Sequence, residues 1–394
     1  MRRVILVGSV VGWCLACGGA LEPLPEGPGP KLLAPTDAAD LSELLEPIRE
    51  EHGVPALSAA VIRGGAVVAI GAVGLDRTDR DTEATVDDLW HVGSDGKAMT
   101  ATLMARLVER DVLSWDTTVG EVLEELGADS GWNGVTVEQL LTHTAGLPAN
   151  PPKSWMLRLL VSSDSPRDQR EQLLMDMLSH PPEWEPGTRF EYSNLGYVTA
   201  AAMAETLTNT AFEALIAAEV FEPLGVVDFG FGPPPPPSPA GHMGDAFTPV
   251  EPVPIADNPR ALAPAGTMHF TLTSWAAFVG AHVAGVRGER TDFLPDEAWS
   301  ELHRARLDEY AMGWGVAEPD WVGTRVFTHS GSNTMWYARA MGVPAWDTAY
   351  LVATNCGADA CRDVAPATMR ALVAAHGAPP ATPEQPDASS PETR

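Results

Sequence analysis

The sequence predicts an α+β fold in which both ends of the chain contribute to one β-sheet and the middle forms a mainly helical lobe. Strand-like runs occur soon after the N-terminus and again in the last third, and the residues between them follow helical periodicity. The chain has 394 residues, of which 45% are hydrophobic, so it can bury a sizeable core. A cleft between two lobes is a common place for a small-molecule site, and we expect the active site there.

The expected elements follow from local patterns along the chain. Apolar residues recur at helical spacing over Leu41–Ile48, which predicts an amphipathic helix that ends near Gly53. Two capping boxes, Thr136–Gln139 and Thr210–Glu213, predict short helices in the middle. The expected strands are 56–62, 66–73, 310–316, 324–328, 335–341 and 348–355, and a last helix is expected over 363–375.

The charge of the chain excludes some classes of partner. It carries 25 basic and 53 acidic side chains, for a formal net charge of −28. Such a field repels nucleic acid and anionic lipid, which leaves a small-molecule or peptide substrate as the expected partner. The sequence predicts no oligomeric state.

The N-terminal segment predicts export. Residues 1–16 combine two arginines with an apolar run too short to span a bilayer, as in a signal peptide. Cys17 follows in a context that resembles a bacterial lipoprotein signal, so we expect a lipid on Cys17 to anchor the protein to a membrane on its periplasmic or cell-surface face. Cleavage without lipidation is the alternative. The Pro- and Gly-rich residues 17–36 are expected to form a tether.

The remaining cysteines and the C-terminal residues complete the predicted organisation. Cys356 and Cys361 are five positions apart in a chain predicted to be exported, which favours a disulfide over two free thiols. Residues 377–394 have the composition of a disordered tail. We therefore predict one domain over 37–376, with the helical lobe at roughly 98–260.

The strongest chemical signal is Ser94 with Lys97. Gly93 permits a tight turn, after which a helix to about Arg110 would place positions i and i+3 on one face. That helix is apolar nearly all round, so Lys97 is expected to be buried with a lowered pKa and to act as a base for the hydroxyl. The chain has only three lysines against 22 arginines, and arginine cannot lose its proton. The alternative is a lysine that reaches the surface beside an incidental serine.

Two further motifs carry polar groups suited to the same chemistry. Tyr192 and Asn194 would face one side, where the phenol could relay a proton and the amide could bind substrate. Alternatively, they are a packed tyrosine and a helix-capping asparagine. His329 and Gly331 precede Ser332, whose backbone N–H could form an oxyanion hole with that of Ser94, or His329 is an ordinary strand-end histidine.

Together and in this order, the three motifs resemble the Ser-x-x-Lys, Tyr-x-Asn and Lys/His-x-Gly motifs of the serine penicillin-recognising superfamily. The branch they resemble most contains class C β-lactamases, D-Ala-D-Ala carboxypeptidases and related esterases. The resemblance extends over roughly Leu41 to Ala375 and includes the stretches 140–148, 186–188, 221–225, 263–266 and 313–315. It implies a β-lactamase/transpeptidase-like fold, with an antiparallel sheet flanked by helices, a helical lobe, and the active site between them.

The resemblance also implies roles for the residues. Ser94 would attack a carbonyl and form an acyl-enzyme, Lys97 and Tyr192 would move the protons, and Asn194 would orient the substrate. His143 would hold a loop, and no metal or organic cofactor is implied. His329 stands where β-lactamases usually have lysine, which favours ester or D-amino-acyl peptide hydrolysis over β-lactam hydrolysis. The alternative is a non-catalytic surface lipoprotein of the same fold that binds cell-wall peptides or a protein partner.

Overall fold

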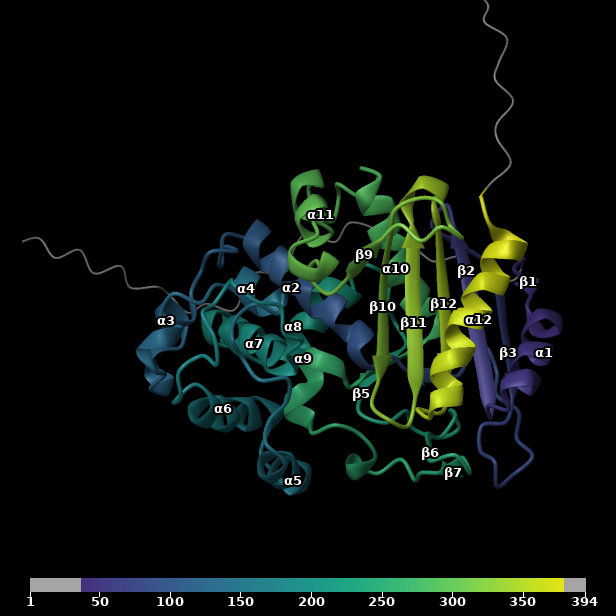
Figure 1. Ribbon diagram of the computed structural model, residues 1–394, viewed down its shortest axis with the longest axis horizontal. Helices are drawn as coiled ribbons and strands as arrows, with labels where there is room; N and C mark the ends of the chain where they lie inside the picture. The colour runs from purple at the N-terminus through teal and green to yellow at the C-terminus, as the bar shows by residue number, and fades with distance from the viewer. Residues whose placement is uncertain (1–36, 379–394) are drawn as a thin grey trace, which may run out of the picture.

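The computed structural model describes residues 37–378, and both ends of this range contribute strands to one central sheet (Figure 1). The strands are β1 Ala39–Asp40, β2 Ala56–Arg63, β3 Ala66–Gly74, β4 Leu89–His91, β5 Phe229–Phe231, β6 His242–Met243, β7 Thr248–Pro249, β8 Met268–Thr271, β9 Gly315–Ala317, β10 Val326–Ser332, β11 Tyr337–Val343 and β12 Thr348–Thr354. The central sheet has the order β1-β3-β2-β12-β11-β10-β9, so early strands lie beside late ones. All of its pairs are antiparallel except β1 with β3. The predicted α+β architecture is confirmed.

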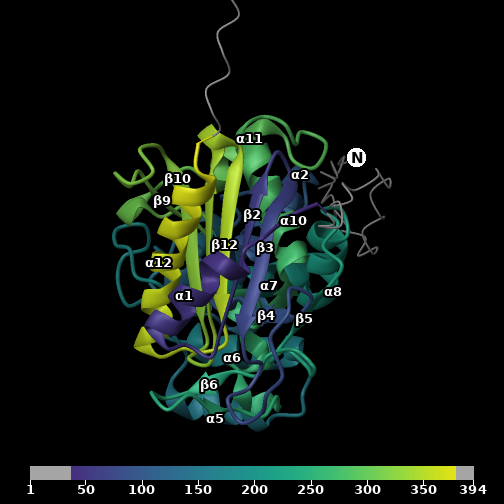
Figure 2. The same ribbon diagram turned by 90° about the vertical axis from the view of Figure 1, so that its right-hand side faces the viewer.

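Helices cover both faces of this sheet and form a lobe beside it (Figure 1). They are α1 Ser42–His52, α2 Gly96–Glu109, α3 Val119–Val122, α4 Val137–Leu141, α5 Lys153–Val161, α6 Pro166–Met177, α7 Asn194–Thr208, α8 Phe212–Ile216, α9 Ala263–Gly266, α10 Leu272–Val286, α11 Asp296–Leu302 and α12 Asp359–His376. On β12, Tyr350 and Val352 pack in one hydrophobic cluster with α1 and α12, whereas Leu351 packs in another with α2, α7 and α10. This alternation is why one strand can bury both faces. Figure 2 shows α1 and α12 side by side on their face of the sheet.

Local patterns predicted several element boundaries correctly, although α12 begins at Asp359, four residues before the predicted start. Gly53 ends α1 in the left-handed conformation, and Thr136 caps α4 in a complete capping box with Gln139. The expected capping box at Thr210 is wrong: α8 begins after Ala211 without a side-chain cap. Its Glu213 bonds to the guanidinium of Arg170 instead, because a buried cation competes more strongly for a carboxylate than an exposed helix end does.

Two predicted strands also differ from the structure near the active site. The run 310–316 is a strand only from Gly315, because Asp308 and Glu309 adopt positive φ and turn the chain so that Tyr310 is buried. Strand β10 continues to Ser332, so His329 and Gly331 lie on the strand and not between two strands. Its pairing with β9 ends at Thr328, which leaves the last residues of β10 unpaired on that side.

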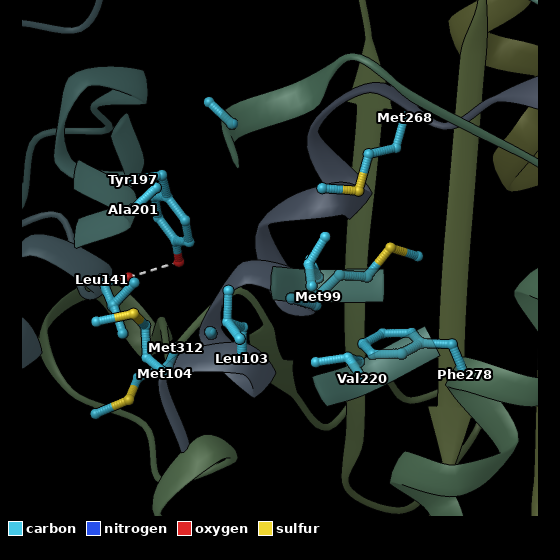
Figure 3. Packing of buried hydrophobic residues seen from close by; sticks show 14 of the residues in the cluster. Met99, Leu103, Met104, Leu141, Tyr197, Ala201, Val220, Met268, Phe278 and Met312 are labelled. Carbon is cyan, nitrogen blue, oxygen red and sulfur yellow. Dashed lines mark hydrogen bonds between the residues drawn. The ribbon is translucent and has the colours of Figure 1, made fainter. Parts of the chain in front are cut away.

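Helix α2 runs through the core where the sheet and the lobe meet. Twelve of its fourteen residues, Gly96 to Leu107, are buried, as its apolar sequence predicts. Figure 3 shows Met99, Leu103 and Met104 of this helix among side chains from α7 and α10. The start of α2 therefore lies in surroundings that contain little water, and this sets the chemistry of Lys97.

Several predictions fall outside residues 37–378. They are the signal peptide at 1–16, lipidation of Cys17, the tether at 17–36 and most of the tail at 377–394. Within the described range, each helix falls short of the length and apolar character needed to cross a membrane.

Candidate active site

The candidate nucleophile, Ser94, lies in a short 3-10 turn, η1 (Gly93–Asp95), that leads into α2. The turn packs directly against the free edge of β10. A Cβ atom at Gly331 would overlap the carbonyl oxygen of Val92 and lie 2.5 Å from the amide nitrogen of Ser94, and one at Gly93 would overlap the amide nitrogen of Ser332. Only glycine permits this approach. The backbone nitrogens of Ser94 and Ser332 are thus neighbours, as an oxyanion hole requires.

Lys97 is fully buried, and its amine lies beside the hydroxyl of Ser94. Nζ is 3.1 Å from Ser94 Oγ, 2.6 Å from Asn194 Oδ1 and 2.6 Å from the carbonyl oxygen of Ala265. All three partners are uncharged. Burial holds the pKa of Lys97 well below its usual range, although the charge of Asp95 acts in the opposite direction.

These contacts suit a neutral amine. An uncharged –NH₂ group has two N–H donors and one lone pair. The side-chain oxygen of Asn194 and the carbonyl oxygen of Ala265 accept hydrogen bonds from both N–H groups. The lone pair is then left for the O–H of Ser94, which is the geometry of a general base with its nucleophile.

Tyr192 lies beside Lys97 and near His329 of β10. Its ring centroid is 4.8 Å from Nζ of Lys97, and it packs 4.3 Å from the ring of His143. Burial raises the pKa of Tyr192, and a hydrogen bond with Ser94 only partly offsets this. The phenol therefore keeps its proton at neutral pH and is available as a proton donor.

Asn194 begins α7 and has contacts on both sides of its amide. Its oxygen accepts from Lys97, and its Nδ2 donates to Oδ1 of Asn150 at 2.6 Å. The residue that caps α7 is Ser193, whose Oγ accepts from the N–H of Gly196. Asn194 is therefore not the helix cap, and its amide bonds to Lys97 and Asn150 instead.

His143 has the structural position expected of it. It is 1% exposed, and its Nδ1 accepts a hydrogen bond from the backbone N–H of Ser193. Its ring also contacts Tyr192, Tyr197 and Tyr310. It thereby ties its own loop to the segment that carries Tyr192.

His329 lies on β10 beside the nucleophile and is uncharged. Burial, together with the neighbouring Lys97, lowers the pKa of His329 to about 3. Its Nε2 is 3.3 Å from the hydroxyl of Tyr310, and its Nδ1 is 3.7 Å from Oδ1 of Asp95. The predicted Lys/His-x-Gly position therefore carries no cation.

Sequence reasoning missed three residues at this site: Asp95, Asn150 and Tyr310. Asp95 lies inside the Ser-x-x-Lys motif and is buried, which a neighbouring serine and lysine do not reveal. Asn150 and Tyr310 come from loops, and only the tertiary fold brings them to Asn194 and His329. No periodicity could have indicated them.

Other features of the molecule lie away from this cluster. Cys356 and Cys361 form a disulfide within the hydrophobic cluster between the sheet and α12. Two cavities, of about 650 and 450 Å³, have linings that include none of Ser94, Lys97 or Tyr192. Among residues 37–378, no group of three or more His, Cys, Asp or Glu side chains is arranged to hold a metal ion.

The fold and this cluster define a protein of the serine β-lactamase and penicillin-binding protein superfamily. The chain belongs to the β-lactamase family, whose model matches residues 41–374.

Relatives of known sequence agree with that assignment. Penicillin-binding protein 4 from Amycolatopsis lactamdurans is 27% identical over 346 residues, which are 82% of this chain and 86% of the relative. Esterase EstB from Burkholderia gladioli is 32% identical over 213 residues, which are 50% of this chain and 53% of the esterase. Relatives of these kinds support a hydrolase of this family.

Solved structures show the same fold. A penicillin-binding protein homologue from Pyrococcus abyssi superposes with a TM-score of 0.71 at 22% identity, over 86% of this chain and 77% of its own. A D-stereospecific amidohydrolase from Streptomyces sp. superposes with a TM-score of 0.66 at 22% identity, over 84% of this chain and 96% of its own.

Proposed function

We propose that the protein is a serine hydrolase that acts through an acyl-enzyme, with Ser94 as nucleophile and an ester or a D-amino-acyl peptide as substrate. The observation that carries this proposal is the set of contacts around Nζ of Lys97. A buried amine with two accepted N–H donors leaves its lone pair for the hydroxyl 3.1 Å away. Because burial lowers the pKa of Lys97, this amine is positioned to remove the proton of Ser94.

The proposed acylation step moves one proton and exchanges one acyl bond. Nζ of Lys97 accepts the proton of Ser94 as Oγ forms a bond to the substrate carbonyl carbon. The backbone N–H groups of Ser94 and Ser332 stabilise the oxyanion. Collapse of this intermediate breaks the bond to the leaving group, which takes a proton from Tyr192, and Lys97 returns its proton to the phenol. Water then attacks the acyl-enzyme by the reverse sequence.

The electrostatics of the site support an ester, or a D-amino-acyl peptide whose carboxylate lies away from the reacting bond, ahead of a β-lactam. β-lactam antibiotics carry a carboxylate, which gains from a cation at the site. Here Lys97 has a lowered pKa, and His329, with a pKa of about 3, is uncharged. The esterase among the relatives is consistent with this ranking.

The proposal is tested by the identity of the acylated residue. Wild-type protein should hydrolyse p-nitrophenyl acetate, and Ser94→Ala should abolish this activity because it removes the hydroxyl that bonds to Lys97. Mass spectrometry after treatment with a fluorophosphonate probe should find the label on Ser94. Ser162→Ala, in the loop after α5, is the matched control and should label and hydrolyse normally. A label on another residue would refute the assignment, and parallel rates with short-chain esters, D-Ala-D-Ala peptides and β-lactams would rank the substrates.

We further propose that the protein is exported and anchored to a membrane through a lipid on Cys17. The support is the lipoprotein-like sequence around this cysteine, after an apolar run of signal-peptide length. In cells fed an alkyne fatty acid, wild-type protein should become labelled and sediment with membranes. Cys17→Ala should abolish the label, and a labelled Cys17→Ala protein would contradict the proposal.

A further inference from the structure

The carboxyl group of Asp95 is buried beside the nucleophile, and its hydrogen bonding is unusual. Asp95 lies between Ser94 and Lys97 in the chain, is 1% exposed, and neither of its oxygens has a hydrogen-bond partner among the described residues. Facing it at 3.7 Å is Nδ1 of His329, which is also buried and has no side-chain hydrogen-bond partner among the described residues. Two unpaired polar atoms at this separation, inside a site, require a physical explanation.

The hydrogen bonds of the neighbouring phenols point to the nitrogen of His329 that carries hydrogen. Tyr197 donates its only hydroxyl proton to the carbonyl oxygen of Leu141 at 2.7 Å (Figure 3). In the hydrogen bond that joins Tyr197 and Tyr310, Tyr197 must therefore accept. The proton of Tyr310 is used in that bond, so its oxygen can only accept from Nε2 of His329 at 3.3 Å.

With its proton on Nε2, the imidazole of His329 can only accept a hydrogen bond at Nδ1. A neutral imidazole carries one proton, and here that proton is on Nε2. Nδ1 therefore needs a donor, and the carboxyl of Asp95 is the group that faces it. A carboxyl group can donate only when it is protonated.

The electrostatics of the pair are consistent with a protonated acid. Burial raises the pKa of Asp95 well above its usual range, and the opposing charges of Arg339 on β11 and of Lys97 are weaker effects. Burial likewise holds His329 uncharged. Both pKa shifts therefore favour the uncharged form of each group.

We propose that Asp95 is a positioning residue that donates a hydrogen bond from its protonated carboxyl to Nδ1 of His329. This bond holds the imidazole as its uncharged, Nε2-protonated tautomer next to Ser94. The two atoms lie 3.7 Å apart, and the close contact of β10 with the turn holds the two residues beside each other; in the proposed state the carboxyl turns toward the ring. The proposed effect on rate rests on the proposed hydrolase function, whereas the tautomer does not.

Two substitutions of Asp95 test whether its side chain acts as a hydrogen-bond donor and not through a negative charge. Asp95→Asn has nearly the shape of the protonated acid, is neutral, and can donate from Nδ2, whereas Asp95→Ala cannot donate. Nitrogen-15 NMR of the imidazole, with His329→Gln to assign the signal, should show the Nε2-protonated tautomer in wild type and Asp95→Asn. In Asp95→Ala the signal should shift toward mixed tautomers.

Kinetics provide the second measurement. With p-nitrophenyl acetate, kcat/KM should stay within about three-fold of wild type in Asp95→Asn and fall roughly 10- to 100-fold in Asp95→Ala, the usual cost of removing an orienting partner. Asp88→Asn, at a buried carboxyl outside the site, is the matched control and should leave both readouts unchanged.

Several outcomes would overturn the assignment of Asp95. They are a proton on Nδ1 in wild type, an unchanged tautomer in Asp95→Ala, or an Asp95→Asn variant as impaired as Asp95→Ala. If Ser94 fails to label in wild type, the proposed hydrolase function fails instead, and the NMR comparison still decides the role of Asp95.

Discussion

Two fully buried basic side chains, Lys97 and Arg170, have opposite surroundings. Arg170 joins α6 to α7 and α8 through hydrogen bonds of 2.6 to 3.1 Å to the carboxylates of Glu205 and Glu213. Burial works against its charge, but these two partners outweigh it, and the pKa of Arg170 is raised. Lys97 forms hydrogen bonds with a hydroxyl, an amide and a carbonyl, none of them charged, and its pKa is lowered.

This difference distinguishes a buried cation that stabilises the fold from a buried amine that can act as a base. A buried cation with matched carboxylates stays charged and ties helices together. A buried amine among neutral partners gives up its proton and becomes a base. In a chain with 22 arginines, the use of lysine at position 97 fits this division, because arginine cannot be neutralised.

The largest effect is expected when Lys97 is made like Arg170. Lys97→Arg should lower kcat/KM for p-nitrophenyl acetate by about 10²- to 10⁴-fold, the usual contribution of a general base, because a guanidinium keeps its proton. Wild-type activity should also rise with pH through the lowered pKa of Lys97, since only the neutral amine is active, and this limb should vanish in the variant. If the Lys97→Arg enzyme kept the full rate, Lys97 would not act as a general base, and its contrast with Arg170 would have no catalytic meaning.

The reciprocal change should affect stability and spare chemistry. Arg170→Ala leaves Glu205 and Glu213 without their cation, which should lower the free energy of unfolding by about 3–5 kcal/mol. Urea titration measures this loss, and Arg170→Lys, which keeps one charge, should lose less. The kcat of the folded fraction should stay near wild type. A drop in kcat with unchanged stability would reverse the assignment of the two residues.

A pair of buried histidines tests whether every uncharged buried base takes part in catalysis. His282 and His303 lie 3.1 Å apart in the core, in a hydrogen-bonded chain with Thr102 and the carbonyl of Trp299. Burial lowers the pKa of His303 to about 4 and that of His282 well below its usual range. We expect these histidines to affect stability and not catalysis.

The histidines should make the folded state less stable as the pH falls, because the unfolded chain binds protons at a higher pH than the folded chain does. The unfolded chain takes up protons near pH 6.5, whereas folded His303 resists until about pH 4, so stability is full above pH 6.5 and falls as the pH drops. At pH 5.5 the loss from His303 alone should be about 1.4 kcal/mol relative to pH 7.5. Urea titrations at the two values measure it, and His303→Gln should reduce the difference. Equal stability of wild type at both values would contradict this account.

Sequence patterns predicted much of the fold because they record local physics. Alternating and helical periodicities located β2, β3, β10, β11, β12 and α1, and the motif order indicated Ser94, Lys97, Tyr192, Asn194 and His329. The Thr210 capping box failed for a reason that lies elsewhere in the chain. Its Glu213 is taken by Arg170, 43 positions away, and no local pattern contains that competition.

By itself, the sequence determined the two-lobed α+β plan and the positions of the hydroxyl and the amine one helical turn apart, since both depend on side-chain type and spacing. Only the tertiary structure decided the charge states at the site. Whether Lys97, Asp95 and His329 carry protons depends on burial and on partners from β10 and α7, which meet only when the chain is folded. Solvation and contact across the fold set a pKa, and a sequence lists residues without showing either.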